Sequence, residues 1–305
     1  MGKKFSGVSQ TMSRFRGWIQ AGATLLTNLH LPNFLKGGLY QGAGKTVCVP
    51  GLNCYSCPAA SGACPIGAFQ AVVGSSKFSF SYYITGFLIL LGVLLGRFIC
   101  GFLCPFGWFQ ELLHKIPTKK LSTKKLMPLT YLKYAVLLVM VLLLPAFLVN
   151  DVGMGDPFFC KYLCPQGVLE GAIPLSLANS GIRAALGKLF TWKFSILLSV
   201  IVLSVVFYRP FCKWLCPLGA FYALFNRVSL FQMKVDKSKC VSCGKCARAC
   251  KMDVDVTKTP NHTECIRCGM CIRACPTNAV CFRYGFGDGK EKENAATLRE
   301  NNNKA

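Results

Sequence analysis

Cysteines near the C-terminus have the residue type and the spacing that bind iron–sulfur clusters. Eight of the nineteen cysteines fall in two runs with the spacing Cys-x2-Cys-x2-Cys-x3-Cys, and a proline follows the second run. In bacterial two-cluster ferredoxins with this spacing, the fourth cysteine of each run ligates the other cluster. The sequence therefore predicts two [4Fe–4S] sites, one formed by Cys240, Cys243, Cys246 and Cys275, the other by Cys265, Cys268, Cys271 and Cys250.

Zinc binding and disulfide formation are the alternatives for these eight cysteines. Structural zinc sites usually use two Cys-x2-Cys pairs without a third cysteine in each run. Disulfides are rare in cytoplasmic domains. Lys251 stands where a proline usually follows the fourth cysteine of the first run, which removes no ligand. Both alternatives are therefore weaker than the iron–sulfur interpretation.

Four shorter repeats with the pattern Cys-Pro-x-Gly precede this region. In the last three, another cysteine stands four residues earlier, whereas the first has Ala60 there and offers Cys54 and Cys57 upstream. Residues four apart share one face of a helix, proline ends the helix at the second cysteine, and the glycine allows the chain to turn. We interpret the repeats as one architectural unit used four times. Their cysteines are Cys64, Cys100 with Cys104, Cys160 with Cys164, and Cys212 with Cys216.

Four apolar stretches are expected to position these repeats, at 18–31, 82–96, 131–149 and 194–208. A helix needs about 20 mostly apolar residues to cross a bilayer, so some stretches must include their flanks. The first is read as a retained helix rather than a cleaved signal. The predicted fold class is a predominantly α membrane protein with about four transmembrane helices and a C-terminal α+β two-cluster ferredoxin-like domain.

The net charge of +23 indicates membrane orientation rather than a nucleic-acid partner, because basic residues flank the apolar stretches. Basic residues concentrate on the cytoplasmic side of membrane proteins. The N-terminus and the ferredoxin domain are therefore predicted to be cytoplasmic, with membrane lipid as a partner. The two basic groups are Lys3, Lys4, Arg14 and Arg16 before the first stretch, and Lys115, Lys119, Lys120, Lys124 and Lys125 after the second.

This topology sorts the repeat cysteines into two layers at the membrane faces. The inner layer holds four thiols, the number that a [4Fe–4S] cluster requires, namely Cys100, Cys104, Cys212 and Cys216. For the outer layer we expect Cys160 and Cys164 with Cys64 and one of Cys54 or Cys57. Packing cysteines or an outer disulfide are the alternatives, and structural roles are expected for Cys48 and Cys281. The hydrocarbon core is about 30 Å thick, which separates the two layers widely.

Composition divides the chain into a membrane domain at 1–228, a ferredoxin domain at 229–285 and a polar tail at 286–305 that we expect to be disordered. Glu111 and His114 could line a quinone pocket, although an interfacial histidine explains His114 more simply. We assign no catalytic residue.

The chain resembles the NapH-type membrane ferredoxins, also called polyferredoxin-like 4Fe-4S membrane proteins. The resemblance is most specific at Cys100-Gly-Phe-Leu-Cys104-Pro, at Cys212-Lys-Trp-Leu-Cys216-Pro and at the eight ferredoxin cysteines. It implies a bacterial inner-membrane component that passes electrons between a quinol pool and a redox partner protein or reductase subunit. The outer cysteines depart from the nitrate type, which puts that specific role in doubt.

The leading hypothesis is an electron-transfer subunit of an oxidoreductase complex, with quinol dehydrogenase as a candidate activity. A membrane redox sensor or regulator, and a thiol–disulfide relay that uses the outer cysteines, are the alternatives.

Overall fold

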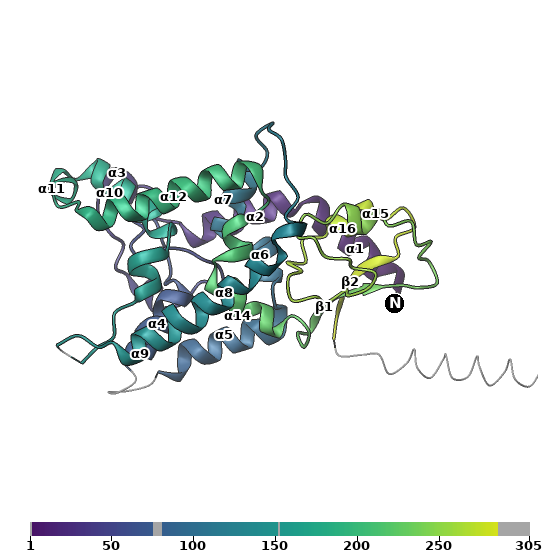
Figure 1. The fold of residues 1–305 in the computed structure, drawn as a ribbon, viewed down its shortest axis with the longest axis horizontal. Helices are drawn as coiled ribbons and strands as arrows, with labels where there is room; N and C mark the ends of the chain where they lie inside the picture. The colour runs from purple at the N-terminus through teal and green to yellow at the C-terminus, as the bar shows by residue number, and fades with distance from the viewer. Residues whose placement is uncertain (1, 76–80, 152, 286–305) are drawn as a thin grey trace, which may run out of the picture.

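The computed structural model describes residues 2–75, 81–151 and 153–285, and most of these residues are helical (Figure 1). The polar tail that was expected at 286–305 lies outside the described residues. Helices that run along the long axis of the molecule end near a small module with one two-stranded sheet.

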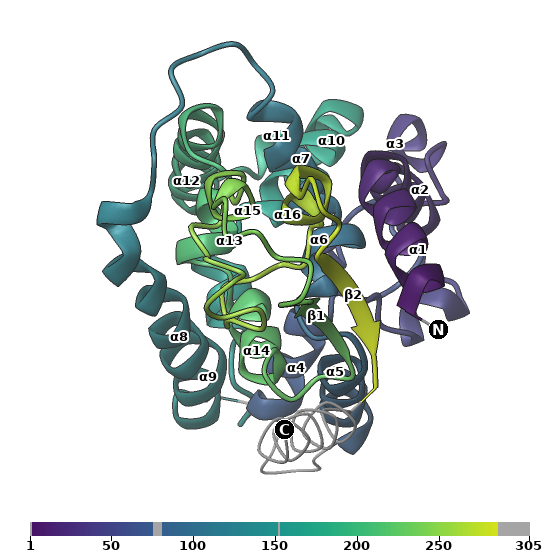
Figure 2. The same ribbon diagram turned by 90° about the vertical axis from the view of Figure 1, so that its right-hand side faces the viewer.

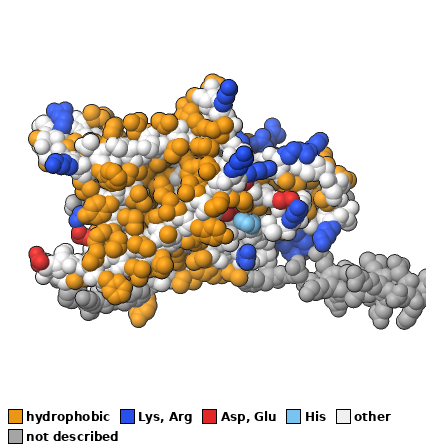
Figure 3. All heavy atoms as spheres, viewed as in Figure 1, with side chains coloured by type: hydrophobic (Ala, Val, Ile, Leu, Met, Phe, Trp, Pro, Cys, Tyr) orange, Lys and Arg blue, Asp and Glu red, His pale blue; other side chains and the backbone are white. Residues whose placement is uncertain are grey.

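Two helical segments are long and apolar enough to cross a membrane. One is Lys124–Phe147 and the other is helix α12, Lys188–Val206. Only 22% and 17% of their most apolar windows are buried, so neither helix is mostly enclosed by the rest of the molecule. Their apolar side chains contribute to a broad hydrophobic surface, with lysines and arginines gathered around the ferredoxin end (Figure 3). The first segment contains η2 (Lys124–Tyr131), α8 (Leu132–Val136), η3 (Leu137–Leu143) and α9 (Leu144–Phe147).

The expectation of four full-length spans is wrong for the described residues. Helix α5 (Tyr82–Leu95) has 14 residues, about 21 Å at the usual rise of 1.5 Å per residue, against a core of about 30 Å. Helix α2 (Arg16–Thr27) has 12 residues and uses polar side chains to bind helix α6 (Phe98–Phe102). Arg16 Nε and Gln20 Nε2 donate to the carbonyl of Gly101 at 2.8 and 3.0 Å.

Short helices that begin directly after the repeat cysteines occupy the centre of the molecule (Figure 2). In three repeats proline is the first helical residue, a position where its missing N–H is not needed. The glycine of each repeat lies in the first helical turn, so it does not turn the chain as expected. These helices are α4 (Pro65–Gly74), α7 (Pro105–Leu113) and α14 (Pro217–Phe225), whereas π-helices η4 (Phe159–Leu163) and η5 (Gly167–Ala172) flank the third repeat and α13 (Pro210–Trp214) precedes the fourth.

The ferredoxin module contains strands β1 (Phe231–Val235) and β2 (Val280–Tyr284), which pair antiparallel with Phe231 opposite Tyr284. Helices α15 (Lys245–Arg248) and α16 (Met270–Ala274) complete it. Several contacts tie the module to the membrane domain, among them an ion pair in which Lys213 Nζ lies 2.9 Å from Asp253 Oδ2, and a hydrogen bond from Arg267 Nη1 to the carbonyl of Leu95 at 2.8 Å.

The N-terminal helix α1 (Gly2–Arg14) packs on this module. Ser9 Oγ accepts a hydrogen bond from the backbone N–H of Phe282 at 3.1 Å. A Cβ added at Gly269 would lie 2.5 Å from Cβ of Ser13, so the two elements are in close contact. Helix α1, which the sequence analysis assigns to the domain at 1–228, therefore contacts the ferredoxin module directly.

Helices α3, α10 and α11 lie at the end of the molecule opposite the ferredoxin module (Figure 1). The remaining bounds are α3 (Asn33–Lys36), η1 (Ala43–Thr46), α10 (Ile173–Ala178) and α11 (Ser180–Ala184).

Candidate iron–sulfur sites

The ferredoxin module contains two small cavities, each of about 20 Å³ and each lined by four cysteines. The cysteines around each cavity are the two sets that the spacing predicts, including the exchange of the fourth cysteine between the runs. The first set is Cys240, Cys243, Cys246 and Cys275, and the second is Cys250, Cys265, Cys268 and Cys271.

The two cysteine runs have the same backbone conformation. Ser242 and Arg267, each just before the second cysteine of a run, have φ values of 52° and both are left-handed. Gly244 and Gly269, each just after that cysteine, have φ values of 68° and 77°. Successive residues with alternating handedness turn backbone N–H groups toward one point, which suits an anionic cluster.

Hydrogen bonds and burial act in opposite directions on the thiols of the module. Burial raises the pKa of the Cys265 thiol to about 12. At Cys275, the hydroxyl of Thr277 and the backbone N–H of Ala279 and Val280 outweigh burial and lower the pKa. Bound iron withdraws the proton from a coordinating thiol, so buried thiols with a high pKa remain suitable ligands.

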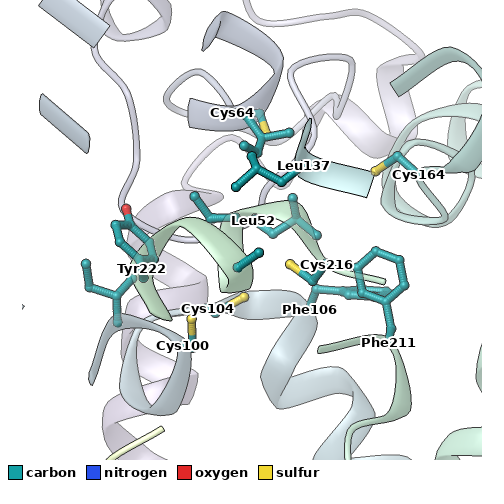
Figure 4. Close-up of a cluster of buried hydrophobic side chains, with 14 of the residues drawn as sticks. Leu52, Cys64, Cys100, Cys104, Phe106, Leu137, Cys164, Phe211, Cys216 and Tyr222 are labelled. Carbon is teal, nitrogen blue, oxygen red and sulfur yellow. The ribbon is translucent and has the colours of Figure 1, made fainter. Parts of the chain in front are cut away.

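The inner quartet consists of Cys100, Cys104, Cys212 and Cys216, all buried and electrostatic neighbours of one another. Cys100 and Cys212 lie in the middle of α6 and α13, and Cys104 and Cys216 directly precede α7 and α14. Figure 4 shows Cys100, Cys104 and Cys216 grouped on one side of Leu52, with Cys64 and Cys164 on the other side.

The outer quartet consists of Cys54, Cys64, Cys160 and Cys164, which line a cavity of about 600 Å³. Cys48, for which a structural role was expected, lines the same cavity. Cys57 instead donates from its sulfur to Asn28 Oδ1 at 3.6 Å. Of the two cysteines that the sequence left open, the geometry favours Cys54. Cys281 lies on β2 opposite Lys234.

The backbone N–H of the glycine in each Cys-Pro-x-Gly repeat lies close to the sulfur of the cysteine three residues earlier, and at Cys216 it donates a hydrogen bond of 3.4 Å. This contact recurs in all four repeats, as expected for unpaired N–H groups in the first turn of a helix. It also places a donor on each sulfur, which favours the thiolate. The pairs are Gly67 with Cys64, Gly107 with Cys104, Gly167 with Cys164, and Gly219 with Cys216.

Two buried glutamines, which the sequence analysis missed, join the repeats in pairs. Gln110 donates to Cys212 Sγ at 3.1 Å and accepts from the N–H of Phe211 at 3.2 Å. Gln70 makes the same two contacts in the outer quartet, with Cys160 Sγ at 3.2 Å and the N–H of Phe159 at 2.9 Å. Each glutamine stands six residues after a repeat cysteine, and this shared position is the signal that could have found them.

The two quartets lie close together rather than at opposite membrane faces. The backbone N–H of Leu52 lies near the sulfur of Cys104, and that of the next residue, Asn53, near the sulfur of Cys64. Consecutive Cα atoms are about 3.8 Å apart, so one short piece of backbone contacts both sites. The loop that carries it passes so close to the inner quartet that a Cβ at Gly51 would lie 2.8 Å from the Cα of Cys104.

Glu111 and His114, which were considered for a quinone pocket, contact other groups of the protein instead. Glu111 accepts from Arg16 and from Tyr208, and its Oε1 lies 2.9 Å from Arg209 Nε. His114 is buried, with Nδ1 3.3 Å from the carbonyl of Ser204. Glu111 is therefore the anion of an arginine cluster, and His114 fits the simpler interpretation of a satisfied histidine.

All nineteen cysteines lie in the described residues, and none of them forms a disulfide there. Within the same ranges, no three His, Cys, Asp or Glu side chains come close enough to hold a single metal ion. A [4Fe–4S] cluster holds its thiolates farther apart than one ion does, because irons and sulfides lie between them. The quartets have the donor type and number for a cluster.

Two family models match the chain. The 4Fe-4S binding domain matches residues 62–82, 79–124, 133–173 and 189–238, just over half of the chain, and its segments include the four repeats. The 4Fe-4S dicluster domain matches residues 232–276, which carry all eight ferredoxin cysteines. No solved structure resembles the chain at a significant level.

Several curated proteins are similar in sequence. An uncharacterized protein of Methanocaldococcus jannaschii is 31% identical over 65% of this chain and 77% of its own length. The putative electron transport protein YccM of Escherichia coli is 26% identical over 56% of this chain and 45% of its own. The ferredoxin-type protein NapH of Haemophilus influenzae is 27% identical over 36% and 52%. The chain thus spans only about half the length of YccM and of NapH. It belongs to the 4Fe-4S binding domain family and is a NapH-like polyferredoxin.

Proposed function

We propose that this chain is a membrane-bound electron-transfer protein with four [4Fe–4S] sites, two in the ferredoxin module and two in the membrane domain. The observation that carries the proposal is that its cysteines form four sets of four, two around small cavities in the module and two joined by the Leu52–Asn53 backbone. When bound, such clusters accept and release single electrons, with potentials that their surroundings set.

The chain's own residues shield these sites to different degrees. The inner quartet is buried, which excludes water from the centre of the molecule. In the module Cys243 is exposed, whereas Cys268 and Cys271 are buried on the side nearer the membrane domain. We infer that a soluble redox partner docks near Cys243 and that the N-terminus and module face the cytoplasm, in keeping with the basic residues around them.

The proposal includes a quinone or quinol as the membrane-soluble partner. The outer cavity of about 600 Å³ has the size of a small-molecule site, and apolar side chains such as Leu52, Val72 and Ile84 line it. Because the cavity is far larger than those of the module, it has room for a ligand beside the outer quartet. The names of YccM and NapH support an electron-transport role.

The amount of iron bound per chain tests the proposal. We expect anaerobically purified protein to contain about sixteen irons with matching acid-labile sulfide, four for each [4Fe–4S] cluster. Cys104→Ser and Cys164→Ser should each lower the count by about four, and each should remove a different signal in redox-titrated EPR spectra. A total of about eight irons, unchanged in both variants, would restrict the clusters to the module and favour a thiol relay in the membrane domain.

A further inference from the structure

Two arginines flank the inner quartet, and both are fully buried. Arg97 and Arg209 each stand three residues before the first cysteine of an inner pair, and both are 0% exposed. The corresponding positions in the outer repeats are Cys57 and Pro157. Arg209 also has a left-handed backbone, with a φ of 50°, a conformation that is costly for a residue with a side chain and is typical of functional sites.

Each arginine belongs to a buried trio with two cations and one carboxylate. Arg97 Nη1 and Lys133 Nζ lie 2.9 and 2.5 Å from Glu264. The two cations contact both oxygens of this one carboxylate. Its single charge leaves one positive charge without a partner in this trio.

The second trio repeats this arrangement on the other side of the quartet. Arg209 and Arg16 both pair with Glu111, so a second positive charge is left over. Taking an uncompensated charge out of water costs several kcal/mol. Two such charges beside one cysteine quartet therefore indicate that an anion belongs between them.

The free donors of the arginines lie at the inner quartet. Nη2 of Arg97 and Nη2 of Arg209 are buried and have no hydrogen-bond partner among the described residues. Nη2 of Arg97 lies 3.7 Å from the place of a Cβ on Gly219, and Nη2 of Arg209 lies 3.1 Å from that on Gly107. Gly219 donates to the sulfur of Cys216, and Gly107 stands three residues after Cys104, so both guanidinium groups are next to thiols of the quartet.

The outer quartet lacks this arrangement. Glu170 lies beside it and accepts from the N–H of Cys54 at 3.0 Å, and the nearby cations are two lysines. Lys193 donates to the carbonyl of Cys160 at 3.0 Å, and Lys45 donates to that of Tyr55. Arginines with free N–H groups are thus a property of the inner quartet.

We propose that Arg97 and Arg209 are positioning residues that compensate the negative charge of a cluster held by the inner quartet and thereby raise its reduction potential. The inference rests on the proposed function, which assigns a cluster to this quartet. Reduction adds a further negative charge, which nearby cations and N–H donors stabilise. Removing an arginine must then disfavour the reduced form, and removing its carboxylate partner must favour it.

Arg209→Gln and Glu111→Gln form a matched pair of variants, because they neutralise opposite charges in the same trio. The full-length protein would be titrated under anaerobic conditions, and the inner-site EPR signal identified as the one that Cys104→Ser abolishes. We expect Arg209→Gln to lower the ratio of reduced to oxidised inner sites at a fixed potential about tenfold, or about 59 mV for a one-electron couple. Glu111→Gln should raise the ratio of reduced to oxidised inner sites instead. Arg209→Lys keeps the positive charge, so its ratio should be close to that of the unsubstituted protein.

The iron count and the signals of the ferredoxin module distinguish the outcomes. If Cys104→Ser loses no iron, the inner site itself is absent, and both the proposed function and this inference fail. If Cys104→Ser loses about four irons but the two charge variants shift the potential in the same direction or not at all, the arginines have only a structural role and the inference alone is overturned. Arg97→Gln removes a positive charge from the other trio, so its effect on the reduction potential tests the inference independently.

Discussion

The outer quartet borders a cavity of about 600 Å³, whereas charged side chains enclose the inner quartet. Both quartets are built on the same frame, which consists of two contacts. A glycine N–H lies beside a cysteine sulfur, and one buried glutamine contacts another cysteine sulfur and joins two repeats. The difference therefore comes from residues outside the frame: arginines at the inner site, and open space with Glu170 at the outer one. A repeated unit has produced two sites that differ in access and in charge.

The largest effect should come from testing which upstream cysteine completes the outer quartet. Cys54→Ser is expected to lose about four irons, the content of one cluster, because Cys54 lines the outer cavity with the three repeat cysteines. Cys57→Ser is the matched control and should keep them, since its sulfur contacts Asn28. Iron analysis of both variants decides the assignment, and loss of iron from Cys57→Ser with retention in Cys54→Ser would reverse it.

A smaller effect is expected where the two quartets share their frame. Gln70→Leu and Gln110→Leu each leave a buried N–H without an acceptor, that of Phe159 or Phe211. An unsatisfied buried donor costs about 1–3 kcal/mol, so both variants should unfold at lower temperature in detergent and by similar amounts. Ser199→Ala on the exposed face of α12 is the control. Clearly unequal losses would show that the frame is not equivalent in the two layers.

The smallest effect should separate the inner from the outer glycines. A Cβ at Gly107 would lie 2.8 Å from the Arg209 guanidinium, whereas at Gly67 the nearest atom is 3.7 Å away. Overpacking costs about 1–3 kcal/mol, partly offset by the better helix propensity of alanine. Gly107→Ala should therefore lower thermal stability and disturb the inner-site EPR signal more than Gly67→Ala does. Equal behaviour would mean that Arg209 moves aside freely.

The ferredoxin sites could be predicted from sequence because their ligands are close together in the chain. The spacing specified which cysteine each run gives to the other cavity, and the structure places the eight cysteines in that arrangement. The inner quartet was also predicted, since two identical pairs must meet to supply four thiols. Local spacing sufficed for the module, whereas the inner quartet also needed the expected order of membrane crossings to select two of the three pairs.

The other features depend on contacts between distant parts of the chain. Gln70, Gln110, Arg97 and Arg209 recur at fixed positions in the repeats, so aligning the repeats would have revealed them. The pairing of Lys133 with Glu264 joins residues 131 apart and has no local signal. The closeness of the quartets arises because the loop at Gly51 passes beside Cys104, which a topology of alternating membrane faces does not predict.

The packing of α1 on the ferredoxin module has a consequence for the order of assembly. The hydrogen bond from Phe282 to Ser9 joins residues 273 apart, nearly the whole length of the chain. At about 5–20 residues per second, the N-terminal helix waits roughly 15 to 55 s after its own synthesis before its partner exists. Helix α1 thus docks only after the ferredoxin module has been made, and until then the face of α1 that packs on the module remains uncovered.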